Sequence, residues 1–348
     1  MHTPLRVGII GYGYWGPNLV RNFFSVDGST VSMVADLEEE NLNKVRSVYP
    51  TIRTTTNAKE VIEDPNTDAI AIATPVSSHY VLAKSAMNAG KHVFIEKPMT
   101  KTSAQAEELV ELAKGKGLIL MVDHTFVFTG AVRKMRELIE SKELGDLYYF
   151  DSARINLGLL QQDINVIWDL APHDLSILSY LVDENPDAVQ AVGHKHVGNN
   201  QEELAFINIS YPSGFHAHIR VSWLSPVKMR LMLIGGSKRM LVYDDVEPSE
   251  KVRVYDKGVN FDISGEEVTA FTPIYRAADV LIPKLDRAEA LKTGAMHFLD
   301  CIKSGKEPVT GGREGLQVVK LLEAASESLA SGGSFIALQH PSYASAVS

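Results

Sequence analysis

An acid and a histidine stand four residues apart in the stretch WDLAPHDL, which runs from Trp168 to Leu175. If this stretch is helical, Asp169 and His173 share one face, and a carboxylate one turn from an imidazole can orient it and raise its basicity. The pair is therefore a candidate reaction centre that accepts a proton. From these residues alone, a metal site and an ordinary helix start, in which an acid precedes Pro172, are open alternatives.

A glycine pattern near the start of the chain is the second candidate. Gly11, Gly13 and Gly16 form G-x-G-x-x-G between an apolar run and a stretch with helical spacing. Such glycines allow a tight turn and a close backbone approach to a pyrophosphate, and the helix N-terminus offers free N–H groups. Asp36 ends the next apolar run, where a carboxylate can bond the ribose hydroxyls, and no cation follows it to hold a 2′-phosphate. We predict a site for NAD, in preference to NADP.

Three aromatic residues, Tyr12, Tyr14 and Trp15, lie between these glycines and are assigned to the same cofactor-binding loop. Their rings could stack on a sugar or a base. Packing of the first helix against the sheet is the favoured interpretation.

A lysine follows a short apolar strand in the run Glu96-Lys97-Pro98. Ligands of parallel sheets bind beyond the carboxyl ends of the strands, so Glu96 and Lys97 are expected beside the cofactor, although such a lysine is often a solvated charge. The stretches GYGYWG, IATPVSSHYVLAKSAMNAGKHVFIEKP and WDLAPHD, in this order, resemble the Gfo/Idh/MocA family of NAD(P)-dependent oxidoreductases. The resemblance spans nearly the whole chain.

The resemblance implies a reaction centre made of Lys97, Asp169 and His173, with the substrate between the nicotinamide and the sheet of a second domain. His173 would take the hydroxyl proton, Lys97 would hydrogen-bond the same oxygen, and Asp169 would orient the imidazole or contact a neighbouring hydroxyl. Whether Lys97 or His173 is the final proton acceptor is left open.

Other positions follow from the same resemblance. Thr74, Pro75 and His79 are expected beside the cofactor, although His79 could equally be a helix N-terminal residue that contacts only water. Arg154 and Asn156 resemble substrate-facing positions. His124 and Phe126 stand where family members often carry an aromatic–arginine pattern, which puts the substrate contacts there in doubt. The cations Arg154, Arg276 and Arg313 are candidates to hold a diphosphate.

The order of strand and helix signals predicts the elements that position these residues. Apolar runs near residues 6–10, 30–35, 51–56, 69–73, 93–95 and 118–122 alternate with helical stretches, which predicts a doubly wound parallel sheet of the Rossmann type. Long alternating runs joined by short turns follow. The predicted fold class is α/β, with a dinucleotide-binding domain at 1–123 and a substrate-binding and oligomerisation domain at 124–348. The second domain is α+β, with a large, mostly antiparallel, open-faced sheet.

Composition narrows the class of protein. The net charge of −9 argues against nucleic acid or an anionic membrane as the main partner. The single cysteine, Cys301, fits a reducing compartment, and no apolar run is long enough to span a membrane. We expect a soluble, cytoplasmic protein.

Two histidine pairs raise the question of a metal. His194 and His196, like His216 and His218, share a face of predicted strands, and four imidazoles could cluster if those strands were neighbours. Polar positions on a half-exposed sheet or at a subunit interface explain them better, so no metal is predicted.

These features predict an NAD-dependent dehydrogenase, or a ketoreductase in reverse, acting on a secondary hydroxyl of a sugar. The spelling GYGYWGPNLVRNF and WDLAPHDLSIL resembles the branch that acts on nucleotide-linked sugars, at C3 of a UDP-N-acetylglucosamine type. The alternatives are a free cyclitol or hexose dehydrogenase of the inositol type and a non-catalytic NAD-binding regulatory protein. The resemblance also implies a homodimer or homotetramer formed through the open face of the second sheet.

Overall fold

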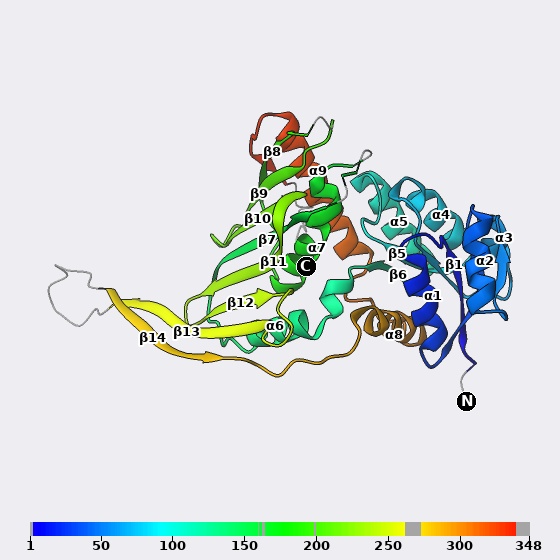
Figure 1. Cartoon of the computed structure of the whole chain (residues 1–348), viewed down its shortest axis with the longest axis horizontal. Helices are drawn as coiled ribbons and strands as arrows, with labels where there is room; N and C mark the ends of the chain where they lie inside the picture. Colours follow the sequence, from blue (N-terminus) through cyan, green and yellow to red (C-terminus); the bar gives the residue numbers. More distant parts are fainter. Residues whose placement is uncertain (1–2, 159, 162–163, 198–199, 262–272, 339–348) are drawn as a thin grey trace, which may run out of the picture. The chain divides into compact units, whose positions relative to one another are not determined.

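The computed structural model describes residues 3–158, 160–161, 164–197, 200–261 and 273–338 (Figure 1). The chain divides into two compact units. The first unit comprises Met1–Gly130 and Arg287–Lys320, and the second comprises Ala131–Asp286 and Leu321–Ser348. None of the described helices is both long and apolar enough to cross a membrane.

A six-stranded parallel sheet forms the centre of the first unit, as the sequence predicts (Figure 1). Helices lie against it because its central strands are buried on both faces; all four residues of β4 are buried, for example. The strands are β1 (Leu5–Ile10), β2 (Ser29–Ala35), β3 (Arg53–Thr55), β4 (Ala69–Ile72), β5 (His92–Glu96) and β6 (Leu120–Asp123), in the spatial order β3-β2-β1-β4-β5-β6. The helices between them are α1 (Gly16–Ser25), α2 (Glu39–Val48), α3 (Ala58–Glu63), α4 (Val76–Asn88) and α5 (Ser103–Lys116), and the 3-10 helix η1 (Thr125–Phe128) follows β6.

The later segment 287–320 completes this unit, although the sequence assigns it to the second domain. It holds α8 (Ala290–Ser304) and the start of α9 (Gly312–Ala330). Phe298 of α8 meets Phe94 of β5 with ring centroids 5.5 Å apart, and Phe23 of α1 joins them. Thr310 exchanges two 2.8 Å hydrogen bonds with the backbone of Val122, so this segment covers the edge of the sheet at β6.

A nine-stranded, mostly antiparallel sheet forms the second unit, and this too agrees with the prediction. Its spatial order is β14-β13-β12-β11-β7-β10-β9-β8-β15, and the pair β7–β10 is parallel. Alternate residues of β9 and β10 are buried, which leaves the opposite face of these strands half-exposed. The elements are α6 (Gly130–Glu140), β7 (Leu147–Leu157), α7 (Val166–Leu181), β8 (Ala188–His194), β9 (Leu204–Ser210), β10 (His216–Ser222), β11 (Leu224–Gly236), β12 (Met240–Asp244), β13 (Val252–Phe261), β14 (Pro273–Leu281) and β15 (Ile336–Ala337).

Helix α7 carries the stretch WDLAPHDL and packs against β7, β9 and β10. The helix does not begin at the acid before Pro172. Its N-cap is Asn165, whose side chain accepts from the backbone N–H of Trp168 at 3.2 Å, so Asp169 lies in the first turn and Pro172 lies inside the helix.

Candidate active site

The glycine loop between β1 and α1 has the geometry that a dinucleotide needs. Gly11 has a φ of +98°, and a Cβ atom there would lie 2.4 Å from the carbonyl oxygen of Ala73. A Cβ atom on Gly16 would lie 2.3 Å from the carbonyl oxygen of Gly11. At Gly13 no atom lies within 4 Å of such a Cβ, so this residue borders open space where a phosphate can approach the backbone.

Asp36 stands at the end of β2 with its carboxylate fixed by the same loop. Its Oδ2 accepts from the backbone N–H of Tyr12 at 2.6 Å, and its Oδ1 accepts from the N–H of Glu38 and the side chain of Asn41. This places a fixed acceptor next to the glycine turn. The neighbouring Leu37 and Glu38 are exposed and offer no cation for a 2′-phosphate, so the residues of the loop fit NAD.

The three aromatic residues of the loop have different surroundings. Tyr12 is buried, which agrees with the packing interpretation. That interpretation is wrong for Tyr14, which is 95 % exposed and stacks on Trp15 with ring centroids 6.4 Å apart. Trp15 is half-buried, and its indole N–H donates to Oδ2 of Asp123 at 3.3 Å.

A buried polar cluster surrounds the lysine that follows β5. Glu96 and Asp123 end the adjacent strands β5 and β6 in direct register, and their carboxyl groups hydrogen-bond. Burial raises the pKa of the Glu96 carboxyl well above its usual range, the nearby Asp123 charge adds to this, and Lys97 opposes it. Burial also keeps His124 neutral by lowering the pKa of its imidazole to about 3, and the charge of Lys97 acts in the same direction.

Of these residues, Asp123 was absent from the sequence-predicted site. The rule that ligands gather beyond the carboxyl ends of parallel strands would have found it, because it ends β6 as Glu96 ends β5.

His79 holds two strand ends together. It lies on α4 but is buried, so the alternative in which it contacts only water is wrong. Its Nδ1 lies 3.0 Å from the carbonyl oxygen of Pro98 and its Nε2 lies 2.8 Å from that of Thr74. Burial lowers the pKa of this imidazole. His79 thus connects the backbone after β4 to the backbone directly after Lys97, while Pro75 is exposed at the start of α4.

In the second unit, Asp169 is held by a tryptophan that the sequence analysis did not single out. The indole N–H of Trp223 donates to Oδ2 of Asp169 at 2.9 Å, and Trp223 is buried. Asp169 and His173 are one turn apart on α7, so the helical spacing on which their pairing depends is present. Asp169 and Trp223 are 54 positions apart along the chain, which is why local spacing did not reveal this contact.

Arg154 lies on β7 in a buried ion pair. Its Nη2 lies 2.7 Å from Oδ1 of Asp174, and its Nε also donates to this carboxylate. Both side chains are almost fully buried. The pair ties β7 to α7, the helix of Asp169 and His173. Asn156, two residues further along β7, is half-buried, and a Cβ atom on Gly158 would lie close to both its side chain and that of Trp223.

The two histidine pairs do not meet the condition for a four-imidazole cluster, because β9 lies between β8 and β10. His218 instead lies 3.3 Å from Asp151. Among the described residues no group of histidine, cysteine and acidic side chains is arranged to hold a metal.

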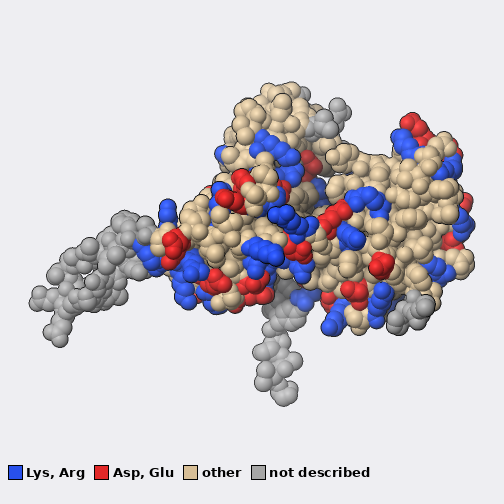
Figure 2. All heavy atoms as spheres, turned by 60° about the horizontal axis from the view of Figure 1, so that its bottom comes forward, with Lys and Arg blue, Asp and Glu red and all other residues tan. Residues whose placement is uncertain are grey.

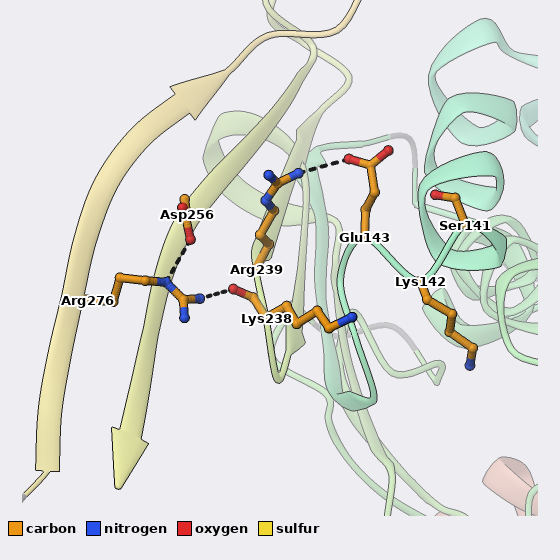
Figure 3. A pocket seen from close by; sticks show the side chains of 7 residues that line it. All are labelled: Ser141, Lys142, Glu143, Lys238, Arg239, Asp256 and Arg276. Carbon is orange, nitrogen blue, oxygen red and sulfur yellow. Dashed lines mark hydrogen bonds and ion pairs between the residues drawn. The ribbon is translucent and has the colours of Figure 1, made fainter. Parts of the chain in front are cut away.

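A separate pocket of about 460 Å³ lies on the second unit (Figure 3). Arg276, one of the candidate diphosphate cations, bonds Asp256 here at 2.7 Å and also donates to the carbonyl oxygen of Lys238. Three strands separate its strand, β14, from β7 with Arg154, so these two arginines do not form one anion site. The lining residues are Ser141, Lys142, Glu143, Lys238, Arg239, Asp256 and Arg276. In the view of Figure 2, acidic and basic side chains are intermixed rather than gathered into one extended basic surface.

Comparison with known proteins gives two family matches. Residues 5–124 match the family described as "Oxidoreductase family, NAD-binding Rossmann fold", and residues 132–242 match the "GFO/IDH/MocA C-terminal domain".

Individual relatives and solved structures are also similar to this chain. The UDP-N-acetylglucosamine 3-dehydrogenase of Acidithiobacillus ferrooxidans is 27% identical over 255 residues, which is 73% of this chain and 78% of that protein. The myo-inositol 2-dehydrogenase of Thermotoga maritima is 25% identical over 336 residues, 93% and 96% of the two chains. Among solved structures, an oxidoreductase from Agrobacterium radiobacter in complex with NAD+, L-tartaric acid and magnesium shares the fold, with a TM-score of 0.80, 20% identity and coverage of 96% and 98% of the two chains.

Proposed function

The chain belongs to the GFO/IDH/MocA family of oxidoreductases with an NAD-binding Rossmann fold, and from this premise we propose that it is an NAD-dependent sugar dehydrogenase. A bound nicotinamide would supply the hydride acceptor for a secondary carbinol carbon, and a protein side chain takes the hydroxyl proton. The observation that carries the proposal is the acid–histidine pair of α7, in which Trp223 fixes Asp169 one turn before His173.

The protein side chains divide the work. His173 takes the hydroxyl proton during oxidation and returns it during reduction, because an imidazole titrates near neutral pH. Lys97 donates a hydrogen bond to the same oxygen and stabilises the negative charge that develops on it. Asp169 orients His173 or contacts a neighbouring hydroxyl, and Arg154 and Asn156 define the substrate side of β7. The pH profiles of Lys97 and His173 variants distinguish which of the two residues finally holds the proton.

Bound NAD supplies the hydride acceptor. The backbone N–H groups at Gly13 and at the start of α1 bind its diphosphate, and Asp36 binds the hydroxyls of its ribose. Tyr14 and Trp15 flank the loop, and Thr74, Pro75, His79 and Glu96 complete the cofactor side.

A nucleotide-linked sugar, oxidised at C3, is the proposed substrate. The support is the relative that acts as a UDP-N-acetylglucosamine 3-dehydrogenase, with 27% identity. A free cyclitol is the second candidate, because the myo-inositol 2-dehydrogenase matches over a larger share of both chains.

The first experiment measures formation of reduced nicotinamide by near-ultraviolet absorbance with NAD and with NADP. The substrates are UDP-N-acetylglucosamine, its uronic acid, free inositol and glucose. Activity with the nucleotide sugars and NAD is expected. Activity with inositol alone would move the chain to the cyclitol dehydrogenases. No activity with any compound in either direction, despite NAD binding, would favour the NAD-binding regulatory protein.

Two variants test the residue roles. H173A is expected to abolish turnover while NAD binding, measured by titration calorimetry, is retained. K97A is expected to lower kcat by at least about a hundredfold, the usual range for loss of a positioned acid–base or charge-stabilising group. The pH profile of H173N against K97A shows which group accepts the proton. If H173A keeps more than about a tenth of the wild-type activity, His173 is not the base.

We also propose assembly into a homodimer or homotetramer in the cytoplasm. The support is the half-exposed face of β9 and β10, where Phe206 stacks on His218 with ring centroids 6.2 Å apart. F206E is expected to shift the mass measured by analytical ultracentrifugation toward the monomer, whereas a mass that is monomeric in the wild type would refute the assembly.

A further inference from the structure

Two buried carboxyl groups of the first unit, those of Glu96 and Asp123, lie side by side at the ends of neighbouring strands. Glu96 and Asp123 are register partners on β5 and β6 and hydrogen-bond each other. Asp123 is only 1% exposed, and Oε1 of Glu96 is shielded from solvent. Two adjacent carboxyl groups in a buried setting do not both ionise at neutral pH, because each charge opposes the other and water does not screen them.

The neighbours of the pair decide which carboxyl keeps the proton. Both oxygens of Asp123 accept from neutral donors: Oδ1 from the hydroxyl of Thr125 at 2.8 Å and Oδ2 from the indole N–H of Trp15 at 3.3 Å. Such donors stabilise a carboxylate. Glu96 is therefore the proton donor within the pair. Burial raises the pKa of both carboxyl groups, but the hydrogen bonds from Thr125 and Trp15 oppose the rise at Asp123, whereas the charge of Asp123 and the hydrogen bond to it add to the rise at Glu96.

The ionisable groups around the pair determine the net charge of the cluster. Lys97 comes directly after β5, and its charge lowers the pKa of both carboxyl groups; its backbone N–H also donates to the Glu96 carboxyl. His124, after β6, and His79, on α4, are neutral because burial lowers the pKa of both imidazoles. Within this cluster the two imidazoles add no charge, and the charge of Lys97 acts on the carboxyl pair.

We propose that Glu96 and Asp123 hold one proton between them at neutral pH, and that the single negative charge on Asp123 positions the ammonium group of Lys97. Both are positioning residues, since they act through Lys97. The indole of Trp15 connects the same carboxylate to the glycine loop, so the cofactor loop and the lysine share one anchor. The functional part of this inference rests on the proposed role of Lys97.

Infrared spectroscopy tests the proton directly, without a substrate. The wild-type protein at neutral pH is expected to show the carbonyl stretch of a protonated carboxylic acid, and this band is expected to fade only above the ordinary range of glutamate. E96Q removes that band. E108Q is the matched control, because Glu108 is an exposed glutamate on α5 that bonds Lys84 and Tyr80. A wild-type spectrum without the band, or one that E96Q leaves unchanged, overturns the shared proton.

The charge on the lysine is measured by titration. Lysines of the full-length protein are methylated with 13C-formaldehyde and followed by NMR, and the signal of Lys97 is assigned by its loss in K97R. D123N is expected to lower the pKa of Lys97 by about one unit or more, because it removes the facing charge. E96Q preserves that charge and is expected to move the pKa much less. Equal shifts in the two variants would show a merely structural role and overturn the positioning.

Kinetics then separate this inference from the proposed function. D123N is expected to lower kcat by about a hundredfold and to displace its pH profile, while E96Q lowers kcat by less than about tenfold. If no sugar is oxidised, the proposed function fails, but the infrared band and the lysine titration still decide the shared proton.

Discussion

At the residue scale, two glycines of the loop are needed for different reasons: Gly11 for its backbone conformation and Gly13 for the space it leaves to the ligand. In G11A the Cβ atom meets a carbonyl oxygen 2.4 Å away at a positive φ, so the variant is expected to lose about 1–3 kcal/mol of unfolding free energy. In G13A the Cβ atom meets no neighbour, so the fold is retained but NAD affinity falls about tenfold. Urea unfolding and titration calorimetry measure the two effects. Normal NAD affinity in G13A would contradict this assignment of the phosphate site.

Two tryptophans give a matched test of Asp169. W223F removes the indole N–H that Asp169 accepts at 2.9 Å, and W168F removes a bond of the same length, from the indole of Trp168 to Ser326. Each loses one hydrogen bond, worth about 1 kcal/mol of stability. Only W223F frees the carboxylate, so its kcat is expected to fall about tenfold or more while W168F stays within about twofold. Equal kcat values would separate Asp169 from the reaction.

At the scale of elements, the buried pair Arg154–Asp174 fixes α7 on the sheet. D174L leaves the guanidinium buried without this carboxylate and is expected to cost about 3–5 kcal/mol of unfolding free energy. The double variant R154M/D174L removes both charges and is expected to recover most of that loss. E143Q, at a half-exposed pair with Arg239, serves as a control with a cost below about 1 kcal/mol. A double variant as unstable as D174L would show that the ion pair is not what couples the two positions.

Glu289 joins the segment before α8 to α1 in a pH-dependent way. Its two oxygens lie 2.5 and 2.8 Å from the guanidinium of Arg21, and this contact lowers the pKa of Glu289 to about 2. Because the folded-state pKa lies below the unfolded one, the stabilisation is complete above about pH 4.5 and is lost as the pH falls toward 2. The pair is about half-exposed, so the contribution is below about 1 kcal/mol.

The measurement is urea unfolding of E289Q and wild type at pH 7 and at pH 3. The difference in unfolding free energy between the two proteins is expected to shrink at the lower pH. A difference that grows on acidification would mean that the pKa of Glu289 is not lowered.

Sequence patterns predicted the elements of the first unit better than the contacts between them. Short apolar runs found β1 to β6, because buried parallel strands leave a continuous apolar signal. The alternative in which a helix starts at the acid before Pro172 is wrong, since the cap of α7, Asn165, stands before the acid and Pro172 lies inside the helix. Helix α6 was not predicted, although its residues GAVRKMRELIE have helical spacing that would have indicated it.

In the candidate site, too, local patterns were predictable from the sequence and contacts between distant residues were not. The glycine loop and Asp36 are local patterns, and the structure places both at one sheet edge. The partners Asp123 and Trp223 depend on strand register and on contacts between residues far apart in the chain, which single-sequence spacing does not encode.

At the scale of the whole molecule, the first unit is built from two separated parts of the chain. Residues 1–130 alone lack Phe298, which contacts Phe23 and Phe94, and lack Thr310, which bonds the backbone of Val122. This fragment is expected to aggregate. A fusion of 1–130 to 287–320 through a flexible linker is expected to be monodisperse and to bind NAD. Light scattering and calorimetry compare them, and tight NAD binding by 1–130 alone would contradict the expectation.

The hydrogen bonds between Thr310 and Val122 also have a consequence for folding during synthesis. A ribosome releases β6 long before it releases the residues that cover it, since the strands of the second unit are synthesised in between. During that interval the nascent chain presents an unpaired strand edge, the kind of surface that pairs with other chains. During synthesis this edge therefore stays exposed to pairing with other chains until residues 287–320 emerge.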